Sequence, residues 1–402
     1  MKILFVDLSP GWGGSLVSLE RLLPRLERPA FEPIVLLAGR NPGRGRFETQ
    51  GIPVRAVPTF AVEMARSNLV IRYVKATPAG GRLRAGRLWV AARGIRDTLT
   101  RTLPLTWRLY RAMRAVRPDL VHVNDAIFVN RPVIAAAWLA GIPAVCHVRS
   151  LGRLAAWDRL WARTLAGCVC ISQWVAADLA AQGVALPHSQ VVYDGLDLAA
   201  YTDLPDRAAA RQALGLPQDA PIVAVLGRLV PWKGQDLFLH ALRRVADVLP
   251  GVVGVIAGEP ESFSLEFGPA LRSLAAELGL AETVRFTGFV RDSRTLLAAA
   301  DLLAHTSVAA EPFGLVMLEA MAAGRPVVTP AEGGGPEIVA DGVTGYLYRP
   351  RDAAALADAI LKVLRDPALA GQMAAAGRAR VAARFTLEQF AADMGQFYGH
   401  LR

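Results

Sequence analysis

Two carboxylates, Glu311 and Glu319, have the most informative surroundings of the chemically active residues in this sequence. Glu319 stands among uncharged, mostly apolar neighbours in a stretch that reads as a short helix. A helix that is apolar on all sides is buried, and a carboxylate inside it is costly unless a polar group meets it. The partner of Glu319 is therefore either a hydrogen bond or ion pair within the protein or a hydroxylated ligand. The spacing alone favours neither interpretation.

A predicted strand–loop–helix–strand unit positions both residues. Leu302–Thr306 and Val327–Thr329 have the composition of buried strands. Between them, Gly314 opens a short helix and Gly324 closes it, because glycine tolerates the left-handed conformation of a helix C-terminus. The loop with Glu311 then lies at the carboxyl end of a parallel strand, where doubly wound sheets bind ligands. The helix start also directs free N–H groups towards that loop, which suits a phosphate.

Glycine loops and polar strand ends recur along the chain. Gly13 and Gly14 follow the first predicted strand, where a tight turn and a closely approaching ligand explain glycine equally well. Arg228 and Lys233 flank a turn before a helix start, which fits a diphosphate clamp or an exposed basic turn. Other strand ends carry His122, Asn124, Asp125, His147, Arg149, Ser172 and Asp194. Such strand ends predict one polar rim facing a cleft, although His122 alternates with valines and is expected to face the core.

Length and composition predict two globular domains. The chain has 402 residues, of which 53% are hydrophobic and 20% charged, so it is neither disordered nor fibrous. Its 3 cysteines have neither a paired framework nor a C-x-x-C spacing, which argues against a disulfide scaffold or a zinc site. A reducing, cytoplasmic location is the natural expectation. No run of 18 apolar residues is present, so the sequence predicts no membrane span.

The net charge of +10 is concentrated in one segment. Arg66 to Arg117 contains most of the excess arginines and a single acid, Asp97. Basic sequence that also carries Trp and Leu suits an anionic membrane surface. A solvated basic face and an anionic acceptor remain alternatives. Nucleic acid is disfavoured, because no base-stacking or groove-reading motif accompanies the charge.

Taken together, these residues resemble the retaining, nucleotide-sugar-dependent glycosyltransferases of family 4, which have the GT-B fold. The resemblance covers essentially the whole chain and is densest between Gly227 and Leu347. Its ordered motifs are Gly227-Arg228, Lys233-Gly234, Thr287-Gly288-Phe289, Glu311 to Glu319 with Phe313-Gly314, Gly324-x-Pro326, Gly333-Gly334, Glu337, Asp341-Gly342 and Thr344-Gly345. Each motif alone is weak, whereas the ordered set is specific.

The resemblance implies an α/β protein of two facing Rossmann-like domains, each a doubly wound parallel sheet, with a cleft between them. Residues 1–197 would form the acceptor-side domain and residues 198–385 the donor-binding domain. The last helix, about 386–402, would pack back on the first domain.

The resemblance also implies roles for individual residues. Arg228 and Lys233 would bind the donor diphosphate, Glu311 the sugar hydroxyls and Glu319 the nucleotide ribose. The predicted catalytic set is Arg228, Lys233, Glu311 and Asn124. The predicted donor-binding set is Gly13, Gly14, Phe289, Val290, Phe313, Gly314, Leu315, Val316 and Glu319. His122, Asp125 and His147 are predicted on the acceptor side. No metal or cofactor is expected besides the donor, since no Asp-x-Asp motif that would hold a metal stands out in the sequence.

One departure from the family pattern concerns Asn124. The strand that usually ends in His-x-His reads His122-Val-Asn124-Asp125 here. An asparagine can hydrogen-bond a sugar hydroxyl but cannot accept a proton as a base. Asp125, Asn130 or His147 are the candidates to compensate.

The function predicted from the sequence is transfer of a sugar from a nucleotide diphosphate to a glycan or a lipid-linked acceptor, at the cytoplasmic face of the membrane and in polysaccharide or cell-envelope synthesis. Two alternatives stay open. One is a non-catalytic nucleotide-sugar-binding protein that lost activity through Asn124. The other is a different GT-B enzyme, such as a phosphorylase or a sugar-nucleotide epimerase, which phosphate-dependent cleavage or donor interconversion would reveal.

Overall fold

The computed structural model describes residues 1–9, 11, 13–39, 41–58, 98–150, 152–186 and 188–401. The chain separates into two compact units. Unit 1 consists of Met1–Ile171, Val175–Tyr193 and Phe390–Arg402, and unit 2 of Ser172–Trp174 and Asp194–Gln389. Of the basic segment singled out above, residues 66–97 lie outside the described part of the chain.

Within the described residues, unit 1 contains a 7-stranded parallel sheet in the order β3-β2-β1-β4-β5-β6-β7. The strands are β1 (Lys2–Asp7), β2 (Glu32–Ala38), β3 (Val54–Val57), β4 (Leu120–Asn124), β5 (Ala144–Val148), β6 (Gly167–Cys170) and β7 (Ser189–Val191). Every residue of β4, β5 and β6 is buried. Helices therefore cover both faces of the sheet, as all-parallel sheets require.

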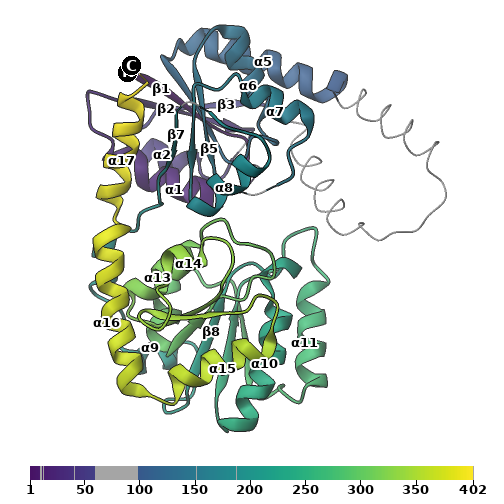
Figure 1. Cartoon of the computed structure of the whole chain (residues 1–402), viewed down its shortest axis with the longest axis vertical. Helices are drawn as coiled ribbons and strands as arrows, with labels where there is room; N and C mark the ends of the chain where they lie inside the picture. Colours follow the sequence, from purple (N-terminus) through teal and green to yellow (C-terminus); the bar gives the residue numbers. More distant parts are fainter. Residues whose placement is uncertain are drawn as a thin grey trace, which may run out of the picture. The chain divides into compact units, whose positions relative to one another are not determined.

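The helices of unit 1 are α1 (Gly14–Leu22), α2 (Arg44–Thr49), α5 (Leu103–Val116), α6 (Arg131–Ala140), α7 (Ala156–Ala162) and α8 (Gln173–Ala181, with its first residues in unit 2), together with most of α17 (Leu387–Gly399). Short 3-10 turns cover Leu23–Arg25, and a π-helical turn, Thr98–Thr102, precedes α5. Figure 1 shows α5, α6 and α7 beside one another, and α5 and α7 each pack against α6.

The last helix begins in unit 2 and joins unit 1 from Phe390 onwards. Its residues Phe390, Met394 and Tyr398 are fully buried there. The Tyr398 ring lies edge-on to Phe5 of β1, with ring centroids 6.2 Å apart. The end of the chain is thus part of the core of the first sheet.

Unit 2 contains a 6-stranded parallel sheet in the order β10-β9-β8-β11-β12-β13. The strands are β8 (Ile222–Leu226), β9 (Val253–Ala257), β10 (Val284–Gly288), β11 (Leu302–Ala304), β12 (Val327–Pro330) and β13 (Gly345–Tyr348). Its helices are α9 (Arg207–Ala213), α10 (Gln235–Val248), α11 (Phe267–Glu277), α12 (Ser293–Ala299), α13 (Leu315–Ala322), α14 (Gly335–Ile338), α15 (Ala353–Leu364) and α16 (Pro367–Arg384). The predicted fold class, two doubly wound parallel α/β sheets, is confirmed.

Each sheet has a point where the strand order changes direction, and there the loops after neighbouring strands diverge. In unit 1 this point lies between β1 and β4, and in unit 2 between β8 and β11. Ligands of open α/β sheets bind at the carboxyl ends of the strands at such a point. The residues that follow these four strands are therefore where a site is expected.

Candidate functional site

The turn after β8 carries Arg228 and Lys233. It includes a 3-10 turn, Pro231–Lys233, and ends at Gly234, whose φ of 66° leads into α10. The Arg228 side chain is 56% exposed, and its guanidinium forms an ion pair with Glu261. Lys233 directly precedes Gly234 at the N-terminal end of a 14-residue helix, where the free N–H groups favour an anion.

Backbone contacts fix this turn to the loop after β11. The Thr306 hydroxyl donates to the Lys233 carbonyl at 2.8 Å, and the Val308 N–H donates to the Trp232 carbonyl at 2.9 Å. A Cβ on Gly234 would lie 2.1 Å from the Thr306 carbonyl oxygen. Only glycine allows this approach, so the sequence Lys-Gly at this turn brings the loops of β8 and β11 together.

The Lys233 ammonium meets the carboxylate predicted to hold a sugar. Lys233 Nζ lies 2.5 Å from Glu311 Oε2, and about one fifth of each side chain is exposed (18% and 20%). The Ser307 hydroxyl donates to the same oxygen at 3.1 Å, and His305 Nε2 lies 3.6 Å away. Lys233 and Glu311 were predicted as site residues from the sequence. His305 and Ser307, in the loop after β11, were not predicted.

Glu311 is held in its charged form. Burial on its own would raise the pKa of this carboxyl. The charge of Lys233 and the hydrogen bond from His305 outweigh burial and hold the pKa well below its usual range. Glu311 is thus an ionised acceptor of hydrogen bonds and does not serve as a proton donor near neutral pH.

A glycine loop supports the backbone of Glu311. The N–H of Gly334 donates to the Glu311 carbonyl at 2.8 Å. A Cβ on Gly333 would lie 2.3 Å from that carbonyl oxygen, and the φ of Gly333 is +71°. The motif Gly333-Gly334 therefore positions the Glu311 loop by backbone contact, which requires the absence of side chains.

Gly333→Ala is expected to destabilise the protein more than Gly342→Ala. Both glycines have nearly the same φ (+71° and +70°), but a Cβ on Gly342 meets nothing within 4 Å. Gly342→Ala should cost only the left-handed strain of about 1–2 kcal/mol. Gly333→Ala should cost about 1–3 kcal/mol more, because its Cβ clashes with backbone. Urea denaturation of the two variants measures the difference, and equal midpoints would show that the contact with Glu311 does not constrain the loop.

Glu319 lies on α13, which starts after Gly314 and ends before Gly324, as predicted. Its carboxylate accepts a hydrogen bond from the Ser293 hydroxyl at 3.0 Å. The expectation of full burial is wrong: α13 buries one face, whereas Glu319 lies on its half-exposed side. The sequence of one apolar helix does not show which of its sides packs against neighbouring elements and which side is left half-exposed.

The other predicted donor residues lie along the same edge of unit 2. Phe289 is 69% exposed and Val290 half-buried in the loop after β10. The Phe313 ring is buried against Phe385, so only its backbone is available to a ligand. Leu315 and Val316 form the half-buried first turn of α13.

A small open hollow lies at the switch point of unit 2. Its polar lining comprises Lys233, Gln235, His305, Thr306 and Ser307, and its apolar lining comprises Val225, Leu226, Leu303, Ala304 and Val316. The buried Gln235 Oε1 has no hydrogen-bond partner among the described residues. The hollow thus combines a cation, hydroxyls and apolar walls, as small-molecule sites commonly do.

In unit 1, Asn124 is the centre of a buried polar network. Its amide donates to Asp7 Oδ2 at 2.7 Å and to the Ser15 carbonyl at 3.1 Å. Its Oδ1 accepts from Arg149 Nε at 2.9 Å. Asp7, at the end of β1, also accepts from the Ser9 N–H and the Ser15 hydroxyl.

This network gives Asn124 a structural role, and its predicted catalytic role stays a prediction. Asn124 is fully buried, and its amide makes three hydrogen bonds to Asp7, Ser15 and Arg149. The side chain therefore positions the ends of β1, β4 and β5. Sequence reasoning overlooked Asp7, although an acid that ends the first strand before a glycine loop was the available signal.

His122 and His147, predicted on the acceptor side, are also fully buried. His122 Nδ1 is hydrogen-bonded to the Tyr398 hydroxyl at 2.8 Å, and His147 Nδ1 lies 3.3 Å from Arg149 Nη2. Burial, with a smaller contribution from Arg149, lowers the pKa of His122 to about 3. Burial and the charges of Arg149 and His122 also hold the pKa of His147 well below its usual range. Both imidazoles are neutral parts of the interior.

The stability of the protein is expected to fall as the pH falls from about 6.5 towards 3. In this window the unfolded chain protonates His122, whose ordinary pKa is 6.5, while the folded chain does not. The unfolded state then binds more protons, so the free energy of unfolding decreases by up to about 1.4 kcal/mol per pH unit for this histidine. His122→Gln should flatten the profile, whereas the exposed control His240→Gln should leave it parallel to that of the wild type. Parallel profiles for both variants would contradict the neutral, buried state of His122.

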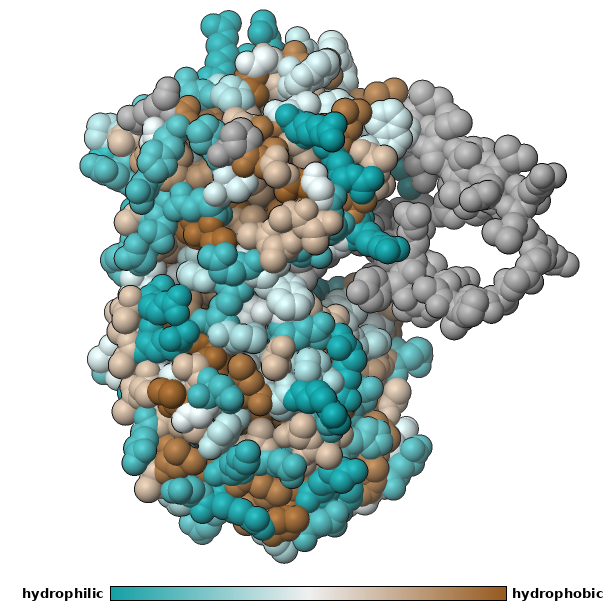
Figure 2. All heavy atoms as spheres, viewed as in Figure 1, coloured by the Kyte–Doolittle hydropathy of each residue, from teal (hydrophilic) through white to brown (hydrophobic). Residues whose placement is uncertain are grey.

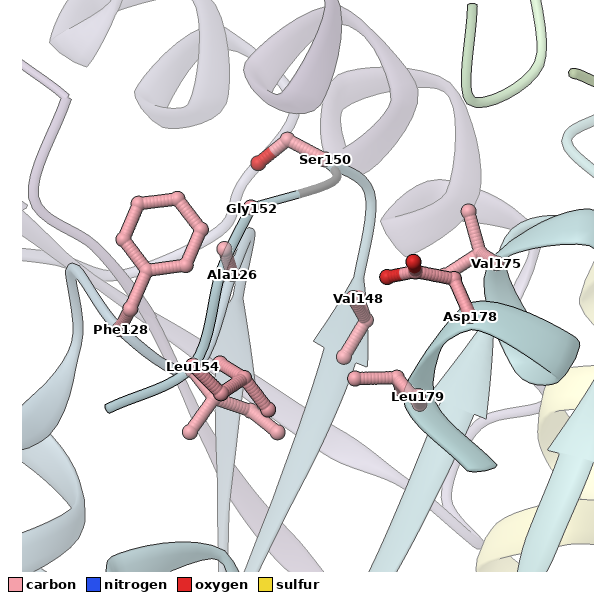
Figure 3. A pocket seen from close by; sticks show the side chains of 10 residues that line it. Ala126, Phe128, Val148, Ser150, Gly152, Leu154, Val175, Asp178 and Leu179 are labelled. Atoms are coloured by element: carbon pink, nitrogen blue, oxygen red, sulfur yellow. The ribbon is translucent and has the colours of Figure 1, made fainter. Parts of the chain in front are cut away.

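Asp125 differs from the two histidines because it lies beside a surface hollow. It has a φ of 84° and accepts a hydrogen bond from the Ser150 hydroxyl at 2.6 Å. Ser150 lines a small open hollow together with Phe128, Gly152 and Asp178. Figure 3 shows the Phe128 ring on one side and the Asp178 carboxylate directed inwards from α8 on the other. This hollow is lined within unit 1 alone.

Gly13 and Gly14 lie at the start of α1, also at the switch point of unit 1. A Cβ on either residue would meet nothing within 4 Å, and Gly13 has an extended conformation that any residue adopts. Neither packing nor backbone geometry therefore explains these glycines. A ligand that approaches the backbone closely would explain them.

Among the residues that the structure describes, no group of three or more His, Cys, Asp and Glu side chains is arranged to hold a metal ion. No described helix has both the length and the apolar composition needed to cross a bilayer.

Two family models together match most of the chain. The model described as Glycosyltransferase Family 4 matches residues 12–200, and the model described as Glycosyl transferases group 1 matches residues 206–380. The chain is also 43% identical over 218 residues to a D-inositol 3-phosphate glycosyltransferase of Mycolicibacterium paratuberculosis, covering 52% of this chain and 48% of that protein. The chain thus spans about half the length of the curated relatives that it matches.

Solved structures match along the full length. The chain resembles Anabaena Alr3699/HepE in complex with UDP and glucose, with a TM-score of 0.81 and 26% identity, covering 99% of both chains. The same protein in complex with UDP-glucose gives a TM-score of 0.81, 26% identity and 100% coverage of both. The sucrose-phosphate synthase of Thermosynechococcus elongatus, 22% identical with a TM-score of 0.75, shares the fold and covers 100% of this chain and 98% of that one.

Proposed function

The chain belongs to the glycosyltransferases of family 4 with the GT-B fold, and we therefore propose that it transfers a sugar from a nucleotide diphosphate to an acceptor hydroxyl. The observation that carries this proposal is the cluster at the switch point of unit 2. There Lys233, the ionised Glu311 and the start of α10 come together beside an open hollow.

The donor diphosphate would lie against Arg228 and Lys233. Each of these cations contacts a carboxylate in this structure, Glu261 and Glu311 respectively. These carboxylates present negative charge to the cations, as a diphosphate would. A bound diphosphate would replace Glu261, which is partly exposed, as the partner of Arg228, and it would share Lys233 with Glu311.

The donor sugar and nucleoside would extend from this point along the edge of unit 2. Glu311 accepts hydrogen bonds and suits sugar hydroxyls, and Glu319, half-exposed beside Ser293, suits the two hydroxyls of a ribose. The exposed ring of Phe289 offers a surface for a base. Because similar structures hold UDP-glucose or UDP with glucose, a UDP-hexose is the first donor to test.

In the proposed reaction the bond between the anomeric carbon and the diphosphate oxygen breaks, and negative charge develops on the leaving phosphate. Lys233, Arg228 and the N-terminal end of α10 would stabilise this charge without a metal ion. The acceptor hydroxyl would attack from the face that the diphosphate leaves and would pass its proton to the departing phosphate oxygen. This course retains the anomeric configuration and requires no protein nucleophile.

The acceptor is proposed to be a glycan or a lipid-linked sugar, reached at the cytoplasmic face of a membrane. The arginine-rich composition of 66–117 supports an anionic surface nearby. On unit 1, the Asp178 carboxylate lines the hollow at the strand ends, and Asp125 lies beside it through its hydrogen bond with Ser150.

A donor panel tests the proposal. The protein is incubated with UDP-, GDP- and ADP-sugars, binding is read as a rise in melting temperature, and turnover is read by proton NMR of the anomeric signal. We expect one nucleotide class to stabilise the protein and its sugar to be released or transferred with the donor's anomeric configuration. The proposal fails if no nucleotide sugar binds, and the retaining step fails if the product has the opposite configuration.

A further inference from the structure

Three neighbouring helices of unit 1 expose large apolar side chains to solvent. Their six exposed residues are Leu103, Trp107, Trp138, Leu139, Trp157 and Leu160, here called the α5–α7 surface. The three tryptophans are 59%, 59% and 68% exposed. An isolated exposed leucine is ordinary, but several large apolar residues gathered on adjacent helices indicate an interaction site.

The three helices lie side by side, α5 and α7 each against α6 (Figure 1). Trp138 of α6 contacts Trp161 of α7, with ring centroids 6.1 Å apart. On α5, Trp107 stacks on Tyr110 at 5.2 Å. Figure 2 shows hydrophobic and hydrophilic atoms interspersed over this part of unit 1.

The charge of this face has one sign. Arg108, Arg111 and Arg114 lie on α5, and all three are exposed. Of the three helices, all of whose residues the structure describes, the sole acid is Asp158. Asp158 is buried and pairs with Arg131, so it adds no negative charge to the surface.

We propose that the α5–α7 surface docks unit 1 on an anionic lipid bilayer. Tryptophan side chains have an apolar ring and a polar N–H, and they favour the boundary between headgroups and acyl chains. Arginines beside them bind lipid phosphates, and each basic residue near an anionic surface adds to the attraction. The mixture of tryptophan, leucine and arginine without exposed acid fits this partner better than an uncharged apolar one.

The sequence alone had pointed to 66–117 for such a role. Of the three helices, α5 falls in that segment, whereas Trp138, Leu139, Trp157 and Leu160 come from α6 and α7 and join α5 only in the folded protein. The inference that this surface brings the enzyme to a lipid-linked acceptor rests on the proposed function. The docking itself rests on the exposed residues.

Vesicle flotation tests the docking with two pairs of matched variants. Leu139→Gln/Trp157→Gln removes apolar surface, and its control Val248→Gln/Leu265→Gln changes equally exposed apolar residues of unit 2. Arg111→Gln/Arg114→Gln removes charge, and its control Arg244→Gln/Arg365→Gln changes exposed arginines of unit 2. All proteins are mixed with phosphatidylglycerol or phosphatidylcholine vesicles at low and high salt.

We expect the wild type and both controls to float with phosphatidylglycerol at low salt and not with phosphatidylcholine. Each surface variant should lower the partition coefficient by roughly tenfold or more. Brominated lipids should quench the tryptophan fluorescence of the wild type more than that of the Trp157 variant.

Three results would overturn the docking. The first is that the surface variants float like their controls. The second is that the wild type binds a polyanionic nucleic acid as well as it binds vesicles. The third is that the wild type sediments as a dimer and the Leu139→Gln/Trp157→Gln variant as a monomer. Nucleotide-sugar binding by the same preparations, measured by calorimetry, separates these outcomes from a failure of the proposed function.

Discussion

Lys233→Ala is expected to lower the kcat for sugar transfer by about 10²- to 10³-fold, the largest effect of any single substitution in unit 2. Lys233 Nζ lies beside the loop that ends β11, where it is 2.5 Å from Glu311. In the proposed reaction this ammonium stabilises charge that appears only as the donor bond breaks. Its loss should therefore reduce kcat more than it raises KM.

A second interpretation of the same loss is that Glu311 remains buried without its cation. The double variant Lys233→Ala/Glu311→Gln distinguishes the two. Its activity is compared with that of Glu311→Gln alone. If the uncompensated carboxylate is responsible, Lys233→Ala should cost no further activity in the Glu311→Gln protein, which would contradict a direct role of the ammonium. We expect a further loss of similar size. Lys362→Ala is the matched control. Lys362 lies on α15, over the Tyr346 ring, and its replacement should leave kcat unchanged.

Asn124→Leu is expected to reduce the free energy of unfolding by about 3 kcal/mol. The leucine has a similar volume but removes a donor to the Asp7 carboxylate and an acceptor for the Arg149 guanidinium. Asp7 and Arg149 are buried, and hydrogen bonds to charged groups cost more to lose than neutral ones. Chemical denaturation followed by fluorescence measures the effect.

Asn130→Leu is the matched control for this substitution. Asn130 is equally buried, but its amide donates only to the backbone carbonyls of Asn124 and Ala126. Its replacement should cost about 1–2 kcal/mol, less than that of Asn124. The opposite order, or an Asn124→Leu protein of normal stability that no longer binds donor, would show that Asn124 acts on the ligand and not on the fold.

Much of the fold could be predicted from the sequence because its strands are apolar runs bounded by glycine. The short helix between Gly314 and Gly324 was predicted correctly, since both glycines adopt the left-handed conformation that ends and starts such elements. The pairing of Lys233 with Glu311 could not be predicted. It depends on the approach of Gly234 to Thr306, a contact between residues far apart in the chain.

The sequence was least informative about burial at the strand ends. Asn124 and His147 lie at or near strand ends, as exposed ligand residues do, yet both are fully buried. The alternation with valines did indicate the core-facing position of His122, which is also fully buried. Whether a polar strand end faces a cleft or the interior depends on what packs over it. Here that packing comes from Tyr398 of the last helix and from Arg149, neither of which adjoins β4 in the sequence.

The most direct test of the donor site in unit 2 is a crystal structure of the protein with a bound UDP-sugar. We predict that the diphosphate lies within hydrogen-bond distance of Lys233 Nζ and of the Arg228 guanidinium, with Glu261 released from Arg228. The ribose should then lie on Glu319 beside Ser293. A nucleotide bound with its phosphates away from Lys233, or with its ribose away from Glu319, would contradict the assignment of this site.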